Sequence, residues 1–163
     1  MNRFFTQYWT NRTCDDHVIY GRSGELLDHT AGNRFREHGV EAGDTVYVVT
    51  VRQGRLFLVG RMTVWKVCDE AEAVAALDYY PWEAKDHLLA ASATRARFDF
   101  EVPLEVTKRL LFQSSEFSKP PLFIEPGVLD HQTLRGVREL DPASARLLDE
   151  LLLGDERIFH SRK

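Results

Sequence analysis

The sequence predicts an α+β domain with a curved, mostly antiparallel sheet and helices along its edges. Two apolar runs, 45–52 and 55–67, are separated only by Gln53-Gly54 and predict a long β-hairpin. Gly60 in the second run predicts a bulge or a close backbone approach, as in strands that bend in small barrels. A leucine stripe near the C-terminus adds an amphipathic helix.

The elements before the hairpin follow from local signals. Aromatic residues and threonine in 3–9 predict a first strand. Residues 11–16 are polar and predict a loop, and the next four permit a short strand. Thr30 is the predicted N-cap of a helix over 31–38, with Gly39 in the left-handed conformation after it.

The elements after the hairpin are predicted in the same way. Asp69 precedes two acidic residues and several alanines, which is typical of a helix N-terminus. Phe98, Phe100 and Val102 alternate with charged residues, which indicates a half-buried strand. The expected elements are helices over 69–77, 81–91 and 103–111, strands over 95–102 and 122–124, and a last helix from Asp141-Pro142.

The last helix carries its leucines on one face. The stripe consists of Leu147, Leu148, Leu151 and Leu152. It belongs either to the core or to a dimer seam, and core packing is the favoured interpretation. The oligomeric state stays open.

Length and composition are those of one globular domain over residues 1–163, with 126–163 as a C-terminal helical extension. Apolar residues make up 44% of the chain and charged residues 28%. The net charge of −4 argues against a protein that coats nucleic acid by bulk charge, but it permits a local basic groove.

Cysteine content and hydropathy predict a cytoplasmic protein. Cys14 and Cys68 have no zinc-site spacing and are expected to be reduced thiols. Residues 1–5 lack a signal-peptide pattern. No apolar run approaches the roughly 20 residues needed to cross a bilayer, so no membrane association is expected.

Catalytic and metal-binding patterns are absent from the sequence. The six histidines show no HxH or HExxH spacing. Ser114-Ser115 lies outside any GxSxG turn, and no glycine-rich loop matches a nucleotide-binding pattern. We therefore expect no metal, no cofactor and no assigned catalytic residue.

Aromatic residues are the stronger functional signal. Trp9 closes the first predicted strand and is followed by Thr10 and Asn11, whose side chains can donate and accept hydrogen bonds. Trp65 and Trp82 are the other tryptophans. Any one of them can be core, but an indole at a cleft would stack on a nucleic-acid base.

Arginines give a second signal. Arg12, Arg22, Arg34 and Arg36 lie close together in the sequence, and Arg135 and Arg138 lie further on. If these segments converge, they form a positive rim suited to phosphate contacts. Solvated surface charge is an equally good interpretation of the sequence.

The order of these segments resembles the PUA-like superfamily, and within it the EVE and YTH branch. The resemblance lies in a strand ending in an aromatic residue (4–9), "AGNRF" (31–35), "GDTVY" (43–47), "LVGRMTV" (58–64) and "FEVPLEV" (100–106). It covers roughly 3–125.

The resemblance implies a small twisted β-barrel with flanking helices and a cleft that receives a flipped, modified base of DNA or RNA. Carried over by position, it makes Trp9, Thr10, Asn11, Asn33 and Trp65 the base-binding residues. Arg12, Arg34 and Arg36 would bind phosphates. The sequence leaves open whether the module acts with a separate nuclease.

Two other interpretations stay open. The related ASCH branch resembles small nucleases and amide hydrolases, for which Lys66, His29 and Glu37 would be candidate residues. A protein that docks through the C-terminal leucine stripe is the third. A binding module rather than an enzyme is the leading expectation.

Overall fold

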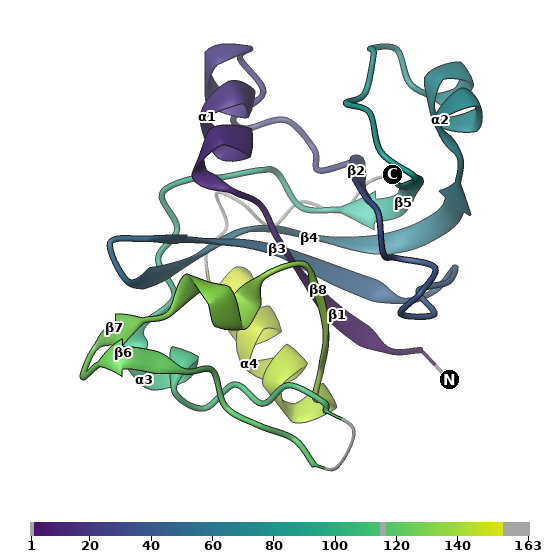
Figure 1. The fold of residues 1–163 in the computed structure, drawn as a ribbon. Coiled ribbons are helices and arrows are strands. Elements are labelled where there is room, and N and C mark those ends of the chain that lie inside the picture. The colour runs from purple at the N-terminus through teal and green to yellow at the C-terminus, as the bar shows by residue number, and fades with distance from the viewer. Residues whose placement is uncertain (1, 115–116, 155–163) are drawn as a thin grey trace.

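A single six-stranded mixed sheet forms the centre of the molecule in the computed structural model, which describes residues 2–114 and 117–154 (Figure 1). The sheet order is β2-β5-β4-β3-β1-β8. Its strands are β1 (Phe4–Tyr8), β2 (His29–Gly32), β3 (Thr45–Arg52), β4 (Arg55–Cys68), β5 (Asp86–Ala93) and β8 (Val137–Leu140). Among these described strands only the β1–β3 pair is parallel, so the predicted α+β class with a mostly antiparallel sheet is confirmed.

Four α-helices, one short 3-10 helix and a small hairpin complete the described part of the chain. They are α1 (Asn11–Ile19), α2 (Glu70–Ala76), α3 (Leu104–Thr107), α4 (Pro142–Leu153), η1 (His131–Leu134) and the hairpin β6 (Phe123–Glu125) with β7 (Val128–Leu129). Figure 1 shows α1 and α2 on one side of the sheet and α4, η1 and the hairpin on the other. None of the described helices has both the length and the apolar character needed to cross a membrane.

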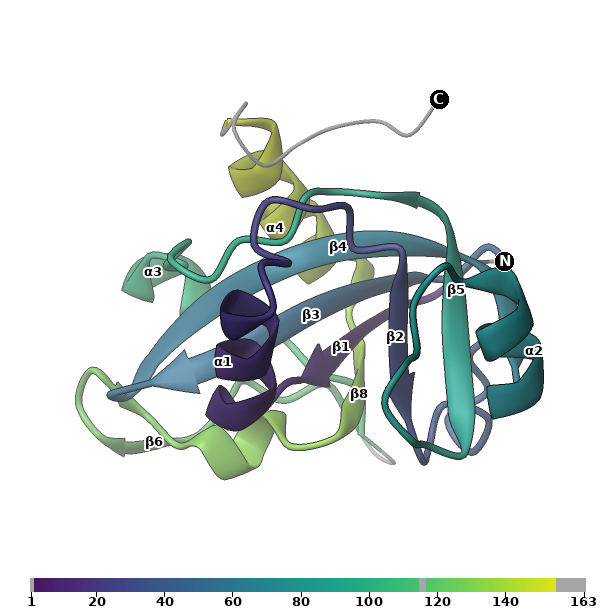
Figure 2. The same ribbon diagram turned by 90° about the horizontal axis from the view of Figure 1, so that it is seen from above.

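The predicted hairpin is the β3–β4 pair. Gln53 and Gly54 both have positive φ angles, 50° and 73°, as a tight hairpin turn requires. The register shifts opposite Gly60, which confirms the predicted bulge. Figure 2 shows how β3 and β4 curve across the molecule. The sheet has β2 and β8 at its edges, and no pairing among the described residues closes it into a barrel.

Side chains of β3 alternate between two cores. Val46 and Val48 belong to the core that also contains Phe5 and Trp9. Tyr47 and Val49 belong to the core on the opposite side, with Leu148 of α4. Both faces of the strand are therefore buried, as its apolar pattern predicts.

Two expected elements near the N-terminus are wrong. The segment expected as a loop and short strand is helix α1, because the Thr10 side chain accepts from the Thr13 backbone N–H and caps it. Thr30 does not cap a helix but lies inside β2, fully buried. Residues 35–39 form a turn, and Gly39 has the expected positive φ of 72°.

Two expected elements after the hairpin are also wrong. Most of the expected helix over 81–91 is β5, which lies between β2 and β4. The segment 95–102, expected as a strand, runs beside β4 through hydrogen bonds such as Val102 N to Leu56 O at 2.8 Å, but only isolated bridges form. Helix α2, capped by Asp69, is confirmed.

The C-terminal segment supplies both a strand and a helix. β8 pairs with β1 in the main sheet, and α4 begins after its N-cap Asp141. Leu148 and Leu152 are fully buried, with Leu147 and Leu151 packed beside them. The favoured core interpretation of the leucine stripe is confirmed. Residues 155–163 of the expected extension lie outside the described residues.

Candidate functional site

Trp9 follows β1 directly, but its side chain is only 2% exposed. Its indole Nε1 donates to Thr30 Oγ1 at 3.0 Å and to Gln7 Oε1 at 3.3 Å. Because the polar edge of the ring makes its hydrogen bonds inside the protein, Trp9 is a core residue. The expectation that Trp9 faces an open slot is therefore wrong.

A second layer of rings covers Trp9. The imidazole of His17, on α1, lies with its centroid 4.4 Å from that of the indole, and Trp82 meets the indole edge-on at 5.7 Å. Trp82 makes further edge-on contacts with His17 at 5.6 Å and with His29 at 5.1 Å. Trp82 is thus the centre of an aromatic cluster that joins α1, β2 and the segment before β5.

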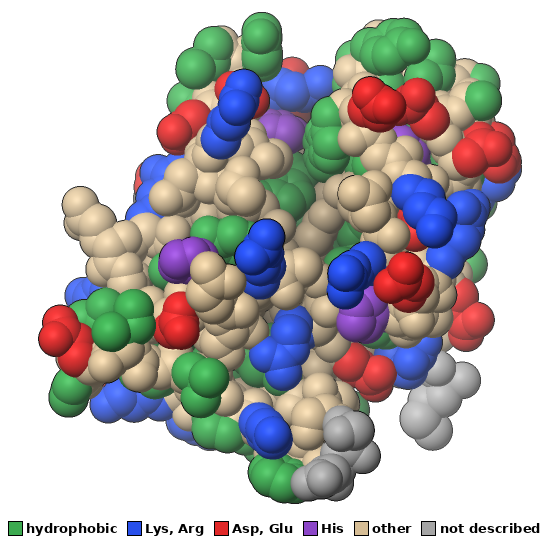
Figure 3. Space-filling view, viewed as in Figure 1, with side chains coloured by type: hydrophobic (Ala, Val, Ile, Leu, Met, Phe, Trp, Pro, Cys, Tyr) green, Lys and Arg blue, Asp and Glu red, His purple; other side chains and the backbone are tan. Residues whose placement is uncertain are grey.

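A cavity of about 590 Å³ opens on the solvent side of this cluster. We call it the Trp82 pocket. Five rings line it: His17, Tyr20, Tyr79, Tyr80 and Trp82. Figure 3 shows the surface hollowed between the lobe of α1 and the lobe of α2, with hydrophobic side chains inside the hollow. The volume lies within the range of small-molecule binding sites.

Two arginines also line the pocket. Arg12 is exposed in the first turn of α1. Arg22 places its guanidinium carbon 3.5 Å from the centre of the Tyr79 ring and pairs with Glu25 at 3.6 Å. Stacking on Tyr79 fixes the Arg22 side chain, whereas Arg12 is available to a ligand at the rim.

The Tyr79 hydroxyl donates to the Asp28 carboxylate at 3.0 Å. Burial of Tyr79, followed by the nearby negative charge of Asp28, raises the pKa of the phenol. The phenol therefore stays protonated at neutral pH. This bond ties the pocket wall to the start of β2.

The remaining predicted base-binding residues lie elsewhere or make other bonds. Thr10 is the N-cap of α1, and the Asn11 Oδ1 accepts from Thr50 Oγ1 at 3.2 Å. Asn11 lines a different cavity with Arg52 and Glu101. The Asn33 Oδ1 accepts from the backbone N–H of Lys85 at 2.9 Å. None of the three lines the Trp82 pocket.

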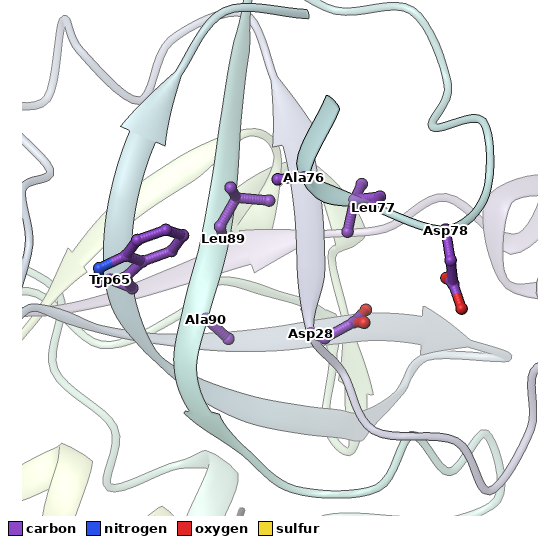
Figure 4. A pocket seen from close by; sticks show the side chains of 7 residues that line it. All are labelled: Asp28, Trp65, Ala76, Leu77, Asp78, Leu89 and Ala90. Carbon is purple, nitrogen blue, oxygen red and sulfur yellow. The ribbon is translucent and has the colours of Figure 1, made fainter. Parts of the chain in front are cut away.

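Trp65 lies on β4 and is 58% exposed. It borders a separate cavity of about 290 Å³ with Leu89 of β5, Leu77 and Asp28. Figure 4 shows the Trp65 ring on β4 beside Leu89, with Asp28 on the other side of β5. The structure therefore does not bring Trp9 and Trp65 together as two walls of one slot.

The predicted phosphate-binding arginines are also separated. Of Arg12, Arg34 and Arg36, only Arg12 lines the Trp82 pocket. Arg36 binds Asp86, which is 1% exposed and accepts from both the Arg36 backbone N–H at 3.1 Å and its guanidinium at 3.0 Å. Arg34 is exposed in the segment after β2.

The candidate residues for an enzyme do not meet in a described cavity. His29 is 3% exposed and bonds to His87. Lys66 pairs with Glu72 at 2.6 Å on the surface, and Glu37 is exposed in the 35–39 turn. Within 2–114 and 117–154, no cluster of His, Cys, Asp or Glu is arranged to hold a metal ion. Cys14 and Cys68 are buried free thiols.

Sequence reasoning missed most of the pocket. The run Tyr79-Tyr80-Pro81-Trp82 is its densest sequence signal, since aromatic residues crowd a stretch that has no helical period. His17 gives no signal in the sequence, because residues 11–16 predict a loop and the next four permit a short strand. A helix there turns His17 toward Trp9, and only the fold shows this.

Comparison with known proteins adds no functional information. No family model matches the chain, and no curated protein matches it. Among solved structures, a hypothetical protein from Leishmania major is similar with a TM-score of 0.48 and 14% identity, over 94% of this chain and 97% of that chain. A likeness this distant supports no functional assignment, so the pocket itself is the basis for interpretation.

Proposed function

We propose that the protein is a nucleic-acid-binding module that holds a flipped, modified base of DNA or RNA in the Trp82 pocket. The supporting observation is the convergence of five rings on one open cavity beside two arginines. A base taken out of its stack needs aromatic faces to replace its neighbours and a concave site to receive it. The Trp82 pocket offers both.

The charge around the pocket supports a nucleic acid rather than a neutral ligand. Arg12 lies exposed at the pocket rim, where the phosphate next to a flipped nucleotide would pass. Figure 3 shows further Lys and Arg side chains across the same face, although the net charge of the chain is −4. Local positive charge, rather than bulk charge, would then hold the backbone.

This proposal keeps the ligand class implied by the EVE and YTH resemblance but places the binding site in the Trp82 pocket instead of at Trp9. The stacking role passes from Trp9 to Trp82 and the tyrosines, while Trp9 supports them from below. A PUA-like barrel remains a prediction of the resemblance.

Tyr80 and Trp82 are two of the aromatic walls of the pocket. Tyr80 is 81% exposed, so Tyr80→Ala removes a pocket wall without opening the core. Tyr80→Ala and Trp82→Ala should each weaken binding of a labelled duplex with one unpaired methylated base by about 5- to 150-fold, since base stacking contributes roughly 1–3 kcal/mol. Fluorescence anisotropy measures the dissociation constants.

Trp65→Ala is the matched control, because Trp65 is exposed but borders the other cavity. It should leave affinity unchanged. If Tyr80→Ala and Trp82→Ala bind as tightly as the unmodified protein while still folded, or if Trp65→Ala alone weakens binding, the proposed site is wrong.

A further inference from the structure

His17 is held in one orientation at the base of the Trp82 pocket. Its ring lies 4.4 Å from Trp9, meets Trp82 edge-on at 5.6 Å and approaches Phe98 at 6.2 Å. Its Nδ1 lies 2.8 Å from the backbone oxygen of Thr13, one turn earlier on α1. Contacts on several sides leave the imidazole little freedom to rotate.

The contact with Thr13 fixes the position of the proton. A carbonyl oxygen only accepts hydrogen bonds, so Nδ1 carries the proton and donates it. Burial is the largest effect and lowers the pKa of His17. The hydrogen bond to Thr13 opposes it, the positive charge of Arg22 lowers the pKa further, and Asp16 has a smaller raising effect. The neutral ring therefore presents a lone pair at Nε2.

That lone pair is free and accessible. Nε2 has no hydrogen-bond partner among the described residues, and it is not one of the unpartnered polar atoms that are closed off from solvent. His17 lines the Trp82 pocket, so the open space beside its ring is the pocket. An unused acceptor at the base of an aromatic cavity is a specific recognition element.

Tyr79 adds a second acceptor. Its hydroxyl donates its hydrogen to the Asp28 carboxylate at 3.0 Å, so the phenol oxygen can only accept a hydrogen bond from a ligand. The guanidinium of Arg22, a donor, is stacked on Tyr79 and paired with Glu25. Two polar atoms among the pocket-lining side chains, His17 Nε2 and the Tyr79 oxygen, therefore accept hydrogen bonds.

We propose that His17 Nε2 makes the pocket selective for bases that carry an exocyclic amino N–H, such as adenine or cytosine and derivatives that keep one amino hydrogen. This inference rests on the proposed function. A ring without that hydrogen would stack equally well but would leave Nε2 unpaired in a site from which water has been displaced. His17 is thus a specificity-determining residue.

The test uses probe pairs that differ only in the amino group. Labelled duplexes carry one unpaired adenine or unsubstituted purine, and in a second pair one unpaired cytosine or 2-pyrimidinone. The amino-bearing probe of each pair should bind about 2- to 10-fold more tightly, as expected for one net hydrogen bond of about 0.5–1.5 kcal/mol.

Two His17 variants separate hydrogen bonding from packing. His17→Phe keeps a planar ring against Trp9 and should reduce the preference within each pair to about 1-fold. His17→Gln restores an acceptor oxygen and should retain part of the preference. His38→Phe, in the exposed 35–39 turn, is the matched control and should keep the full preference.

The tautomer is checked directly by ¹⁵N NMR of the labelled imidazole. The free protein should show His17 protonated at Nδ1, and an amino-bearing probe should shift the Nε2 resonance. Tight but equal binding within each pair, or an Nε2-protonated His17, overturns the inference and leaves the proposed function standing. No binding of these probes or of the duplex with one unpaired methylated base overturns the proposed function itself.

Discussion

His29 and His87 form a directed pair of hydrogen bonds in the interior. His87 Nε2 lies 3.2 Å from the Ala84 backbone oxygen and must donate to it, so His87 Nδ1 accepts from His29 Nε2 at 2.9 Å. His29 Nδ1 is then left as a buried lone pair without a partner among the described residues. Burial, the neighbouring His87 and Arg22 lower the pKa of His29 to about 3.

This pair predicts acid sensitivity. Unfolded histidine titrates near pH 6.5, so between about pH 6.5 and 3 the unfolded chain binds a proton that folded His29 does not. Stability therefore falls as pH is lowered through that window, and His29 adds no pH dependence above it. From pH 7 to pH 5 the loss due to His29 should be about 2 kcal/mol.

Urea unfolding at the two pH values measures this effect. The difference between the unmodified protein and His29→Leu isolates the histidine from the carboxylates, which titrate in both. The variant should lose about 2 kcal/mol less than the unmodified protein on acidification. Identical losses would show that His29 is protonated in the folded state.

At the scale of elements, the sequence predicts those helices and strands that depend on local signals better than those that depend on tertiary packing. The β3–β4 hairpin was predictable because two apolar runs and a two-residue turn lie next to each other in the chain. Helix α2 was predictable from its cap, Asp69. These features depend on residues within one element.

Elements that depend on distant neighbours were not predictable. Leu88, Leu89 and Ala90 favour a helix by propensity. They form β5 because β2 and β4 pair with its backbone on both edges, and their side chains are buried in the folded protein. Helix α1 is polar along most of its length, and its buried Cys14 gives too weak a pattern to indicate a helix. The pocket needs α1 and the segment before β5 together, so it could not be placed from the sequence.

The bulge in β4 gives a prediction for this strand. A methyl group added at Gly60 would lie 2.9 Å from Thr94 Oγ1 and 3.1 Å from Leu27 Cδ2. Thr94 cannot easily move, because its hydroxyl accepts from the Arg61 backbone N–H at 2.9 Å. Gly60→Ala should therefore destabilise the protein by about 1–3 kcal/mol, the typical cost of overpacking.

Thermal or urea unfolding tests this against Gly154→Ala. The nearest atom to a methyl group at Gly154 is 3.5 Å away, and its φ of −77° suits any residue. That control should stay close to the unmodified protein. A Gly60→Ala protein of unchanged stability would mean that Leu27 and Thr94 can shift without cost.

At the scale of the whole molecule, the sheet separates two cores and only one of them adjoins the Trp82 pocket. Trp9 belongs to the core on that side. On the other side, the Tyr47 hydroxyl donates to Asp149 of α4 at 2.7 Å, and Arg61 pairs with the same carboxylate at 3.1 Å. These contacts hold α4 against the face of the sheet that lies away from the pocket.

The chain as a whole is acidic, so the proposed binding to nucleic acid would depend on a few cations in defined places. Arg12 lies at the pocket, and Arg12→Ala should weaken binding of all probes alike and reduce the slope of log K against log salt by about one.

Arg36→Ala is the control, because the Arg36 guanidinium already binds Asp86 at 3.0 Å. That variant should lose stability, since it leaves a buried carboxylate without its cation, and should keep the salt slope. Anisotropy titrations across a salt series measure both slopes, and equal slopes for Arg12→Ala and the unmodified protein would place the phosphate path away from α1.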